Sequence, residues 1–334
     1  MGKAVTMRVI ESTLKGKYRD QLLCEDGIFI GNKLVAVIDG VTSHGTLFWH
    51  GGSSGGFAKD MLCEYLRSHE DELAEVSAKE CFHRLNCVLA ERGREVYPSL
   101  YEGAPAADRL AEYPRACVIL FNSVAGEVWS YGDCQCRIGE ELHCEEKEVD
   151  RLLSELRTFV IMSGMREQAA RMKVPVQRFA VPHMNSNEAE QKNIEQVPGL
   201  AAFEKEYLAK ITKHDIGREA VVPLIEKQLW FENRPGMFGY PVLNGLNFAE
   251  EMVKVWTVPS GTEVVLASDG YPQICRTLEE SEAKLREIIA EDPLCLGVGG
   301  GKAGVKGIME GMESFDDRAY VRVIADCRCM EQGK

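Results

Sequence analysis

Four short acidic motifs, spread over almost the whole chain, lie where apolar strands are expected to begin or end. Three of them adjoin runs with the composition of strands, at residues 34–38, 263–267 and 319–324. A carboxylate at the end of a buried strand is costly unless something neutralises it. Several carboxylates from distant segments therefore predict a bound divalent cation. The motifs are Val37-Ile38-Asp39-Gly40, Ser130-Tyr131-Gly132-Asp133, Ala267-Ser268-Asp269-Gly270 and Ser314-Phe315-Asp316-Asp317.

Composition narrows the class of protein and of partner. With 334 residues, 45% hydrophobic and 27% charged, the chain has the make-up of a soluble globular protein with a sizeable core. A formal net charge of -13 argues against nucleic acid or an anionic membrane as partner. We expect neither a spanning helix nor a signal peptide. The 12 cysteines lack zinc-ligand spacing, which predicts free thiols in the cytoplasm; the oligomeric state is left open.

Strand and helix patterns come in blocks, which indicates an α+β fold with mostly antiparallel sheets. Two apolar runs within residues 27–38 are separated by Gly31-Asn32-Lys33, a hairpin signal. Amphipathic helices are expected near residues 57–66 and 76–92, and a capping box of Thr277 and Glu280 opens another. We expect a single domain over residues 1–334, with a polar, mostly helical insertion at about 140–245.

Hard divalent ions such as Mg²⁺ and Mn²⁺ select carboxylate, carbonyl and water oxygens. A glycine after a ligating aspartate lets the backbone carbonyl approach the ion, and both Asp39-Gly40 and Asp269-Gly270 have that order. Two such ions suit the attack of water on phosphorus. The glycine-rich stretches 51–56 and 297–302 lack the Lys-Ser/Thr ending of a P-loop, so we interpret them as flexible loops.

The order of these motifs resembles the metal-dependent protein serine/threonine phosphatases of type 2C, the PPM family, in a divergent, bacterial-like form. The family has an upstream Asp, then Asp-Gly after an apolar strand, then Gly-Asp, then Ser-Asp-Gly, then Asp-Asn or Asp-Asp before the last strand. The resemblance runs from about residue 18 to 325 and is weak through 140–245. It implies a four-layer α-β-β-α sandwich of two antiparallel sheets flanked by helix pairs. The matching positions are Asp20, Asp39-Gly40, Gly132-Asp133, Ser268-Asp269-Gly270 and Asp316-Asp317.

The resemblance assigns a role to each of these residues. Asp39 bridges two metal ions, Mn²⁺ or Mg²⁺, and the Gly40 carbonyl binds one of them. Asp269 and Asp316 complete the second site, and Asp20 acts in the outer shell through water. The nucleophile is the water between the two ions, and the expected substrate is phosphoserine or phosphothreonine in a protein.

Several positions depart from the family pattern. Arg19 stands where the family usually has Glu directly before the upstream Asp, and Lys15 stands where an Arg often binds phosphate; Lys15, Arg19 or Lys17 could take that role. His44 follows Asp-Gly at a different spacing and is a candidate general acid. Gln273 replaces an Asp that, with the residue at Asp133, forms a third and weaker metal site in the family.

Other functions stay open at this stage. A PPM-like fold without useful turnover could serve as a regulatory or binding module. A rebuilt insertion could direct the site to small phosphate esters rather than to phosphoproteins. A nucleotide-binding role for the glycine loops is the weakest alternative, because the P-loop ending is missing.

Overall fold

The computed structural model describes residues 5–42, 45–50, 52–171, 200–297 and 301–327. The chain forms two compact units, each assembled from separate segments. The first combines Met1–Lys147, Leu229–Leu285 and Asp316–Lys334; the second combines Glu148–Gln228 and Arg286–Phe315. His44 lies outside the described residues.

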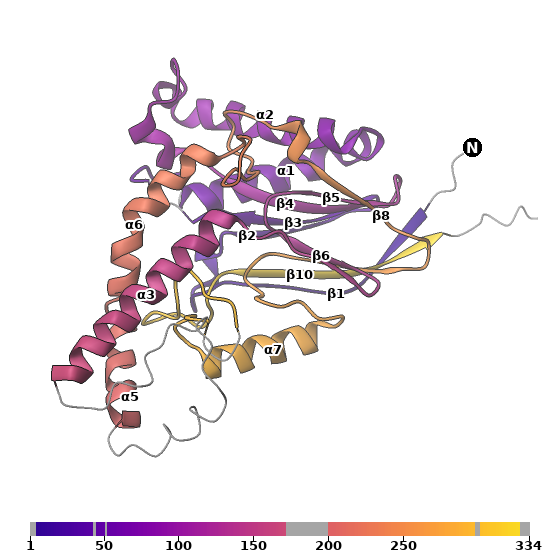
Figure 1. The fold of residues 1–334 in the computed structure, drawn as a ribbon. Helices are drawn as coiled ribbons and strands as arrows, with labels where there is room; N and C mark the ends of the chain where they lie inside the picture. The colour runs from indigo at the N-terminus through magenta and orange to yellow at the C-terminus, as the bar shows by residue number, and fades with distance from the viewer. Residues whose placement is uncertain (1–4, 43–44, 51, 172–199, 298–300, 328–334) are drawn as a thin grey trace, which may run out of the picture. The chain divides into compact units, whose positions relative to one another are not determined.

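The first unit contains two five-stranded sheets, one ordered β1-β10-β9-β6-β7 and the other β2-β3-β4-β5-β8. Every neighbouring pair of these strands is antiparallel. The expected α+β class with two antiparallel sheets is therefore confirmed (Figure 1). The first sheet consists of β1 (Val5–Lys15), β10 (Arg318–Cys327), β9 (Glu263–Ala267), β6 (Gln135–Ile138) and β7 (Glu141–His143). The second consists of β2 (Asp26–Ile30), β3 (Leu34–Gly40), β4 (Ala116–Asn122), β5 (Glu127–Tyr131) and β8 (Lys254–Thr257).

The β2–β3 hairpin forms where the sequence predicts it. The Gly31 amide donates to the Leu34 carbonyl at 2.9 Å, which closes the turn. The strands then pair from Ile30 opposite Val35 to Asp26 opposite Asp39. Because β3 is central and almost wholly buried, its run of apolar residues is continuous rather than alternating.

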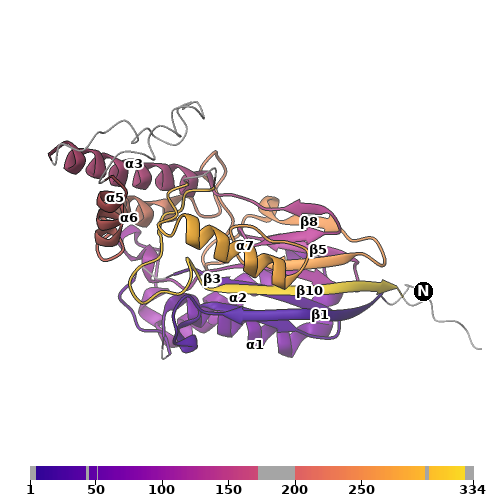
Figure 2. The ribbon, with the colours of Figure 1, turned by 90° about the horizontal axis from the view of Figure 1, so that it is seen from below.

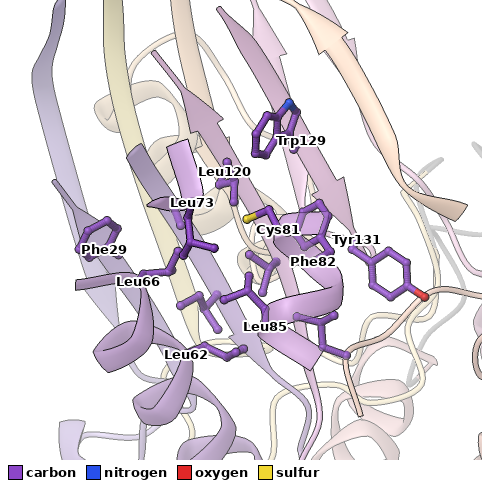
Figure 3. Packing of buried hydrophobic residues seen from close by; sticks show 14 of the residues in the cluster. Phe29, Leu62, Leu66, Leu73, Cys81, Phe82, Leu85, Leu120, Trp129 and Tyr131 are labelled. Carbon is purple, nitrogen blue, oxygen red and sulfur yellow. The ribbon is translucent and has the colours of Figure 1, made fainter. Parts of the chain in front are cut away.

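Two helices, α1 (Ser54–Glu75) and α2 (Ala78–Val96), pack on the second sheet. Each begins at a serine N-cap: the Ser53 hydroxyl accepts from the Gly56 amide at 3.1 Å, and Ser77 accepts from Glu80 at 3.3 Å. Figure 3 shows their apolar faces meeting side chains from the strands. The largest of these are Leu62, Leu66 and Leu73 of α1, Phe82 and Leu85 of α2, and Phe29, Leu120, Trp129 and Tyr131 of the sheet.

The two sheets lie face to face, with β10 in contact with β2 and β3, and β9 in contact with β4. The first half of α7 (Leu278–Glu291) lies along the other sheet, as the view from below shows (Figure 2). Its predicted capping box is confirmed, because Thr277 N donates to Glu280 Oε2 at 3.2 Å and Glu280 N donates to Thr277 Oγ1 at 3.3 Å. The long strand β1, which pairs with β10, was not predicted from the sequence.

The second unit is helical, with α3 (Glu148–Arg171), α5 (Leu200–Ile211) and α6 (Ile216–Gln228). A buried ion pair stabilises it: Arg157 donates from Nε and Nη2 to Asp215 Oδ2 at 2.9 and 2.7 Å. These helices lie within the range 140–245 where the sequence predicts helical character, in its described parts, and the role of that range as an insertion stays a prediction. Short 3-10 helices complete the elements at Gln21–Leu23 (η1), Pro98–Leu100 (η2), Ala107–Glu112 (η3), Leu229–Phe231 (η4) and Glu250–Met252 (η5).

None of the helices in the described ranges combines the length and the apolar character needed to cross a membrane. The cysteines whose side chains are described all carry free thiols.

Candidate metal centre

Three of the predicted aspartates converge in the first unit. One oxygen from each of Asp39, Asp133 and Asp269 lies within 4.8 Å of the others. Asp39 comes from the end of β3, Asp133 from the turn between β5 and β6, and Asp269 from the residues after β9. The sequence prediction that these strand-end carboxylates meet is therefore matched by their placement. Their roles as ligands remain a proposal.

Local packing determines where each of these carboxylates lies. Gly132 has a φ of +131°, and a side chain there would collide with Cys117, so the turn before Asp133 requires glycine. Gln135 holds the turn around Asp269, because its Nε2 donates to the Ser268 carbonyl at 3.1 Å and to the Tyr271 carbonyl at 2.6 Å.

Gly40 is packed too closely for any other residue. Its amide donates to the Glu25 carbonyl at 3.1 Å, and a Cβ at this position would lie 2.5 Å from the same oxygen. Gly55, in the first turn of α1, is equally restricted, because a Cβ there would lie 2.5 Å from the Val41 carbonyl oxygen. The Gly/Ser-rich stretch therefore starts α1 against the end of β3, where it helps to fix Asp39.

Asp316, the fourth of the predicted aspartates, is bound to a lysine. Lys17 Nζ is 3.0 Å from Asp316 Oδ1, 3.3 Å from Glu25 Oε2 and 3.3 Å from Asp317 Oδ2. The same ammonium donates to Thr42 Oγ1 at 3.1 Å. Lys17 is 5% exposed. Sequence reasoning named Lys17 only as one possible phosphate ligand, and the structure instead shows it bound to acidic side chains.

Asp317 connects three segments of the first unit. Its carboxylate accepts from the Lys17 amide at 2.7 Å and from the Glu25 amide at 3.0 Å. It therefore holds the chain after β1 and the start of the β2–β3 hairpin against the start of β10. This explains why an acid follows Asp316: Asp317 bridges backbone amides and is itself buried, at 2% exposure.

Asp26 is a residue that sequence reasoning missed. It pairs directly with Asp39 in the hairpin, is 2% exposed, and receives a hydrogen bond from the Ser268 side chain. Its Oδ2 atom is buried without a hydrogen-bond partner among the described residues. Glu25 directly precedes Asp26, and the family that the motifs resemble usually has Glu directly before its upstream Asp. The signal was therefore present, as Glu25-Asp26 at the start of a hairpin strand.

Asp20, to which that role was assigned, occupies a different place. Its side chain is exposed and caps η1 by accepting from the Leu22 amide at 3.0 Å. Lys15 is also outside the cluster, with Nζ 3.2 Å from Glu282 Oε2 and a side chain that is 46% exposed. Arg19 is exposed as well. The outer-shell role of Asp20 and the phosphate-binding roles of Lys15 and Arg19 stay predictions, as does the role of His44.

The aspartates of the cluster affect one another's ionisation. Burial, and then the charge of Asp269, raises the pKa of Asp39 well above its usual range. Burial raises the pKa of Asp26 in the same direction, reinforced by Asp316, Asp317 and Asp269. Both shifts follow from carboxylates that share a space with little solvent.

Two lysines offset part of this excess. Burial acts to raise the pKa of Asp133, but Lys147, with Nζ 2.6 Å from Asp133 Oδ2, and hydrogen bonds from the Cys117 thiol and the backbone together lower it. For Lys17, burial alone would lower the pKa, and the charges of Asp316, Glu25 and Asp317 raise it overall, so this lysine stays protonated.

The donor set fits a hard divalent cation. It consists of carboxylate oxygens on Asp39, Asp133 and Asp269, with the partnerless Oδ2 of buried Asp26 nearby in the hairpin. Oxygen-only ligand sets select Mg²⁺ or Mn²⁺ over softer metals. A divalent cation here would also relieve the repulsion that raises the pKa values of Asp39 and Asp26.

Comparison with known proteins gives a consistent but distant picture. No family model and no curated protein matches the chain. Among solved structures, the serine/threonine phosphatase PstP/Ppp of Mycobacterium tuberculosis is similar at 14% identity and a TM-score of 0.42, covering 96% of this chain and 99% of that one. Stp1 of Staphylococcus aureus is similar at 11% identity and a TM-score of 0.41, covering 97% and 96%.

A third similar structure is described as the PPM Ser-Thr phosphatase MsPP from Mycobacterium smegmatis, with cacodylate. Its identity is 13% and its TM-score 0.38, covering 95% of this chain and 99% of that one. All three structures are described as serine/threonine phosphatases, and MsPP as a PPM enzyme. Structural similarity at this level says nothing about the activity of this chain.

Proposed function

We propose that this protein is a metal-dependent phosphomonoester hydrolase that removes phosphate from phosphoserine or phosphothreonine in proteins. The observation that carries the proposal is the convergence of Asp39, Asp133 and Asp269 within 4.8 Å, from three strand ends far apart in sequence. A bound cation would offset the repulsion between carboxylates placed this close together.

In this proposal some residues bind the metal ions and others position them. Asp39, Asp269 and Asp316, with the Gly40 carbonyl, hold two divalent ions, Mn²⁺ or Mg²⁺. When bound, such ions activate water and stabilise the charge that develops on phosphate oxygens. Asp26 holds the hairpin end beside Asp39, and Lys17 fixes the orientation of Asp316 through the 3.0 Å contact to Oδ1.

The wider setting is part of the same proposal. We place the enzyme in the cytoplasm with a phosphoprotein substrate, as a single phosphatase domain whose helical segment at about 140–245 shapes access for the substrate. A third metal ion at Asp133 is disfavoured by Lys147, which already pairs with that carboxylate at 2.6 Å.

The test is hydrolysis of p-nitrophenyl phosphate by the full chain at increasing Mn²⁺ concentration. We expect metal-dependent turnover in the parent and a loss of at least about a thousandfold in Asp39→Asn, since several kcal/mol of transition-state stabilisation depend on the ions. Asp71→Asn is the matched control, because Asp71 has a side chain that is 89% exposed and pairs with Lys33. A comparison of phosphopeptide with small-ester turnover then separates a protein phosphatase from a small-molecule phosphatase.

A second candidate is a regulatory module with this fold and no useful turnover. The specific observation in its favour is that Lys17 and Lys147 already pair with Asp316 and Asp133. Mn²⁺ binding by the parent without turnover of either substrate class would favour this module over the hydrolase.

A further inference from the structure

The contact between Lys147 and Asp133 is better shielded from water than the exposed ion pairs in the described parts of the chain. Lys147 Nζ lies 2.6 Å from Asp133 Oδ2, and the side chains are 15% and 13% exposed. By comparison, the pair of Lys254 and Glu145 spans 3.4 Å with side chains about half exposed. A short ion pair with little water around it is screened much less by solvent and salt.

Lys147 is held from a second side as well. Its Nζ lies 5.1 Å from the centroid of the Tyr240 ring, within the range of a cation–π contact. The Asp133 carboxylate also interacts with the Cys117 thiol. The ammonium is therefore positioned at Asp133 by fixed neighbours and is not a mobile surface group.

The Asp133 carboxylate can therefore interact with two different cations, a bound metal ion and the Lys147 ammonium. One of its oxygens belongs to the group with Asp39 and Asp269, and its Oδ2 pairs with Lys147. A divalent cation bound by the three aspartates would lie a few ångströms from the Lys147 ammonium. Two like charges at that separation repel each other even in a water-like medium.

We propose that Lys147 is the resident cation of Asp133 and that it lowers the affinity of the Asp39–Asp133–Asp269 cluster for divalent metal. The inference rests on the proposed function, because that function makes Asp39 and Asp269 of this cluster metal ligands. Lys147 is then a positioning residue that acts through Asp133, and it sets the metal concentration at which the centre fills.

The experiment measures Mn²⁺ binding to the metal-free full chain by isothermal titration calorimetry. Lys147→Met removes the charge and should tighten Mn²⁺ binding about tenfold, the size expected for one charge near a divalent ion in a water-like medium. Lys147→Arg keeps the charge and should bind like the parent. Lys254→Met, which removes one positive charge where the partner is Glu145, should change the affinity less than about twofold.

A second measurement separates action through Asp133 from a general change in charge. In an Asp133→Asn background the effect of Lys147→Met should shrink to less than about threefold, because the carboxylate for which lysine and metal compete is gone. An undiminished effect in that background overturns the role assigned to Asp133.

The remaining outcomes are also distinct. Equal Mn²⁺ affinity in the parent and Lys147→Met overturns the inference and leaves the proposed function in place. Binding that appears only in Lys147→Met supports it strongly. An absence of Mn²⁺ binding in the parent and in every variant overturns both. Should Lys147→Met fold poorly, Lys147→Gln tests the same loss of charge with a polar side chain.

Discussion

The two units of this protein both bury charged side chains, and they balance the charge in opposite ways. In the second unit, Arg157 faces Asp215 with side chains that are 0% and 2% exposed, and the guanidinium also donates to the Gly304 carbonyl at 2.9 Å. Asp215 in turn accepts from the Arg218 amide at 2.7 Å at the start of α6. One cation meets one carboxylate there, and the remaining hydrogen-bonding atoms find backbone partners.

In the first unit, Asp26 is buried and Asp39 is half-buried beside further carboxylates, whose charges help to raise the pKa of both groups. A carboxylate that faces a matched cation is neutralised within the chain, whereas crowded carboxylates must hold a proton or bind a cation from solution. The comparison therefore separates a structural use of buried charge from a functional one, and each prediction below tests one side of it.

The largest effect on stability is expected in the second unit. Arg157→Met leaves Asp215 buried without its partner, which should lower the free energy of unfolding by about 3–5 kcal/mol. Urea denaturation followed by circular dichroism measures it. Arg151→Met, on the exposed face of α3, is the matched control. A loss no greater than that of the control would mean that the pair does not stabilise the fold.

The next effect concerns Asp26 and Asp20. Asp26→Asn should reduce Mn²⁺-dependent turnover by about a hundredfold, equivalent to about 2.7 kcal/mol, because Asp26 is buried directly opposite Asp39. Asp20→Asn should have a smaller effect, since that side chain is exposed and caps η1. The measurement is kcat/KM of the two variants. A larger loss in Asp20→Asn than in Asp26→Asn would mean that Asp20, rather than Asp26, supports the metal site.

The stability of the metal-free protein should depend on pH through Asp39. Burial raises its pKa in the folded state, so the folded protein keeps a proton that the unfolded chain releases near pH 4. Its contribution to stability is therefore lost as the pH rises above about 4, by at most about 1.4 kcal/mol for each pH unit.

Asp39→Asn removes this loss. In EDTA the variant should equal or exceed the parent in stability, by a margin that grows as the pH rises from 4 to 7. Thermal unfolding at a series of pH values measures the margin. Saturating Mn²⁺ should stabilise the parent and leave the variant nearly unchanged, and a margin that stays flat with pH would argue that Asp39 is already neutralised within the chain.

The smallest effect is expected from exposed pairs in the second unit. Arg151 contacts Glu148 and Glu155, with all three side chains at least 37% exposed. Glu155→Gln should lower the free energy of unfolding by no more than about 0.5 kcal/mol, and less at high salt. A loss above about 1 kcal/mol would remove the distinction between buried and exposed pairs drawn here.

Sequence alone predicted those parts of the fold whose signals are local. The β2–β3 hairpin follows from Gly31-Asn32 between apolar runs, and the start of α7 from Thr277 and Glu280, whose reciprocal hydrogen bonds are present. The strand β1 was not predicted, because its alternation of polar and apolar residues indicates a strand only when its partner β10 is known.

The candidate site shows the same division. Asp39, Asp133 and Asp269 could be named because each follows a local motif at a strand end. The partners that hold the cluster could not be named, because their contacts join distant segments. Lys17 meets Asp316 across 299 residues of sequence, and Asp26 faces Asp39 only through the register of the hairpin.

The contacts of Asp317 also have a consequence for how this protein is made. Its carboxylate accepts hydrogen bonds from the amides of Lys17 and Glu25. These two residues must therefore meet Asp317 before this part of the first unit can form. During synthesis on the ribosome, the acidic residues from the earlier strands emerge before Asp316 and Asp317 have been added to the chain. Contacts between residues so far apart form slowly. A nascent or prematurely terminated chain that lacks β10 should therefore be unable to assemble the centre, which confines any activity to chains that have been translated at least through that strand.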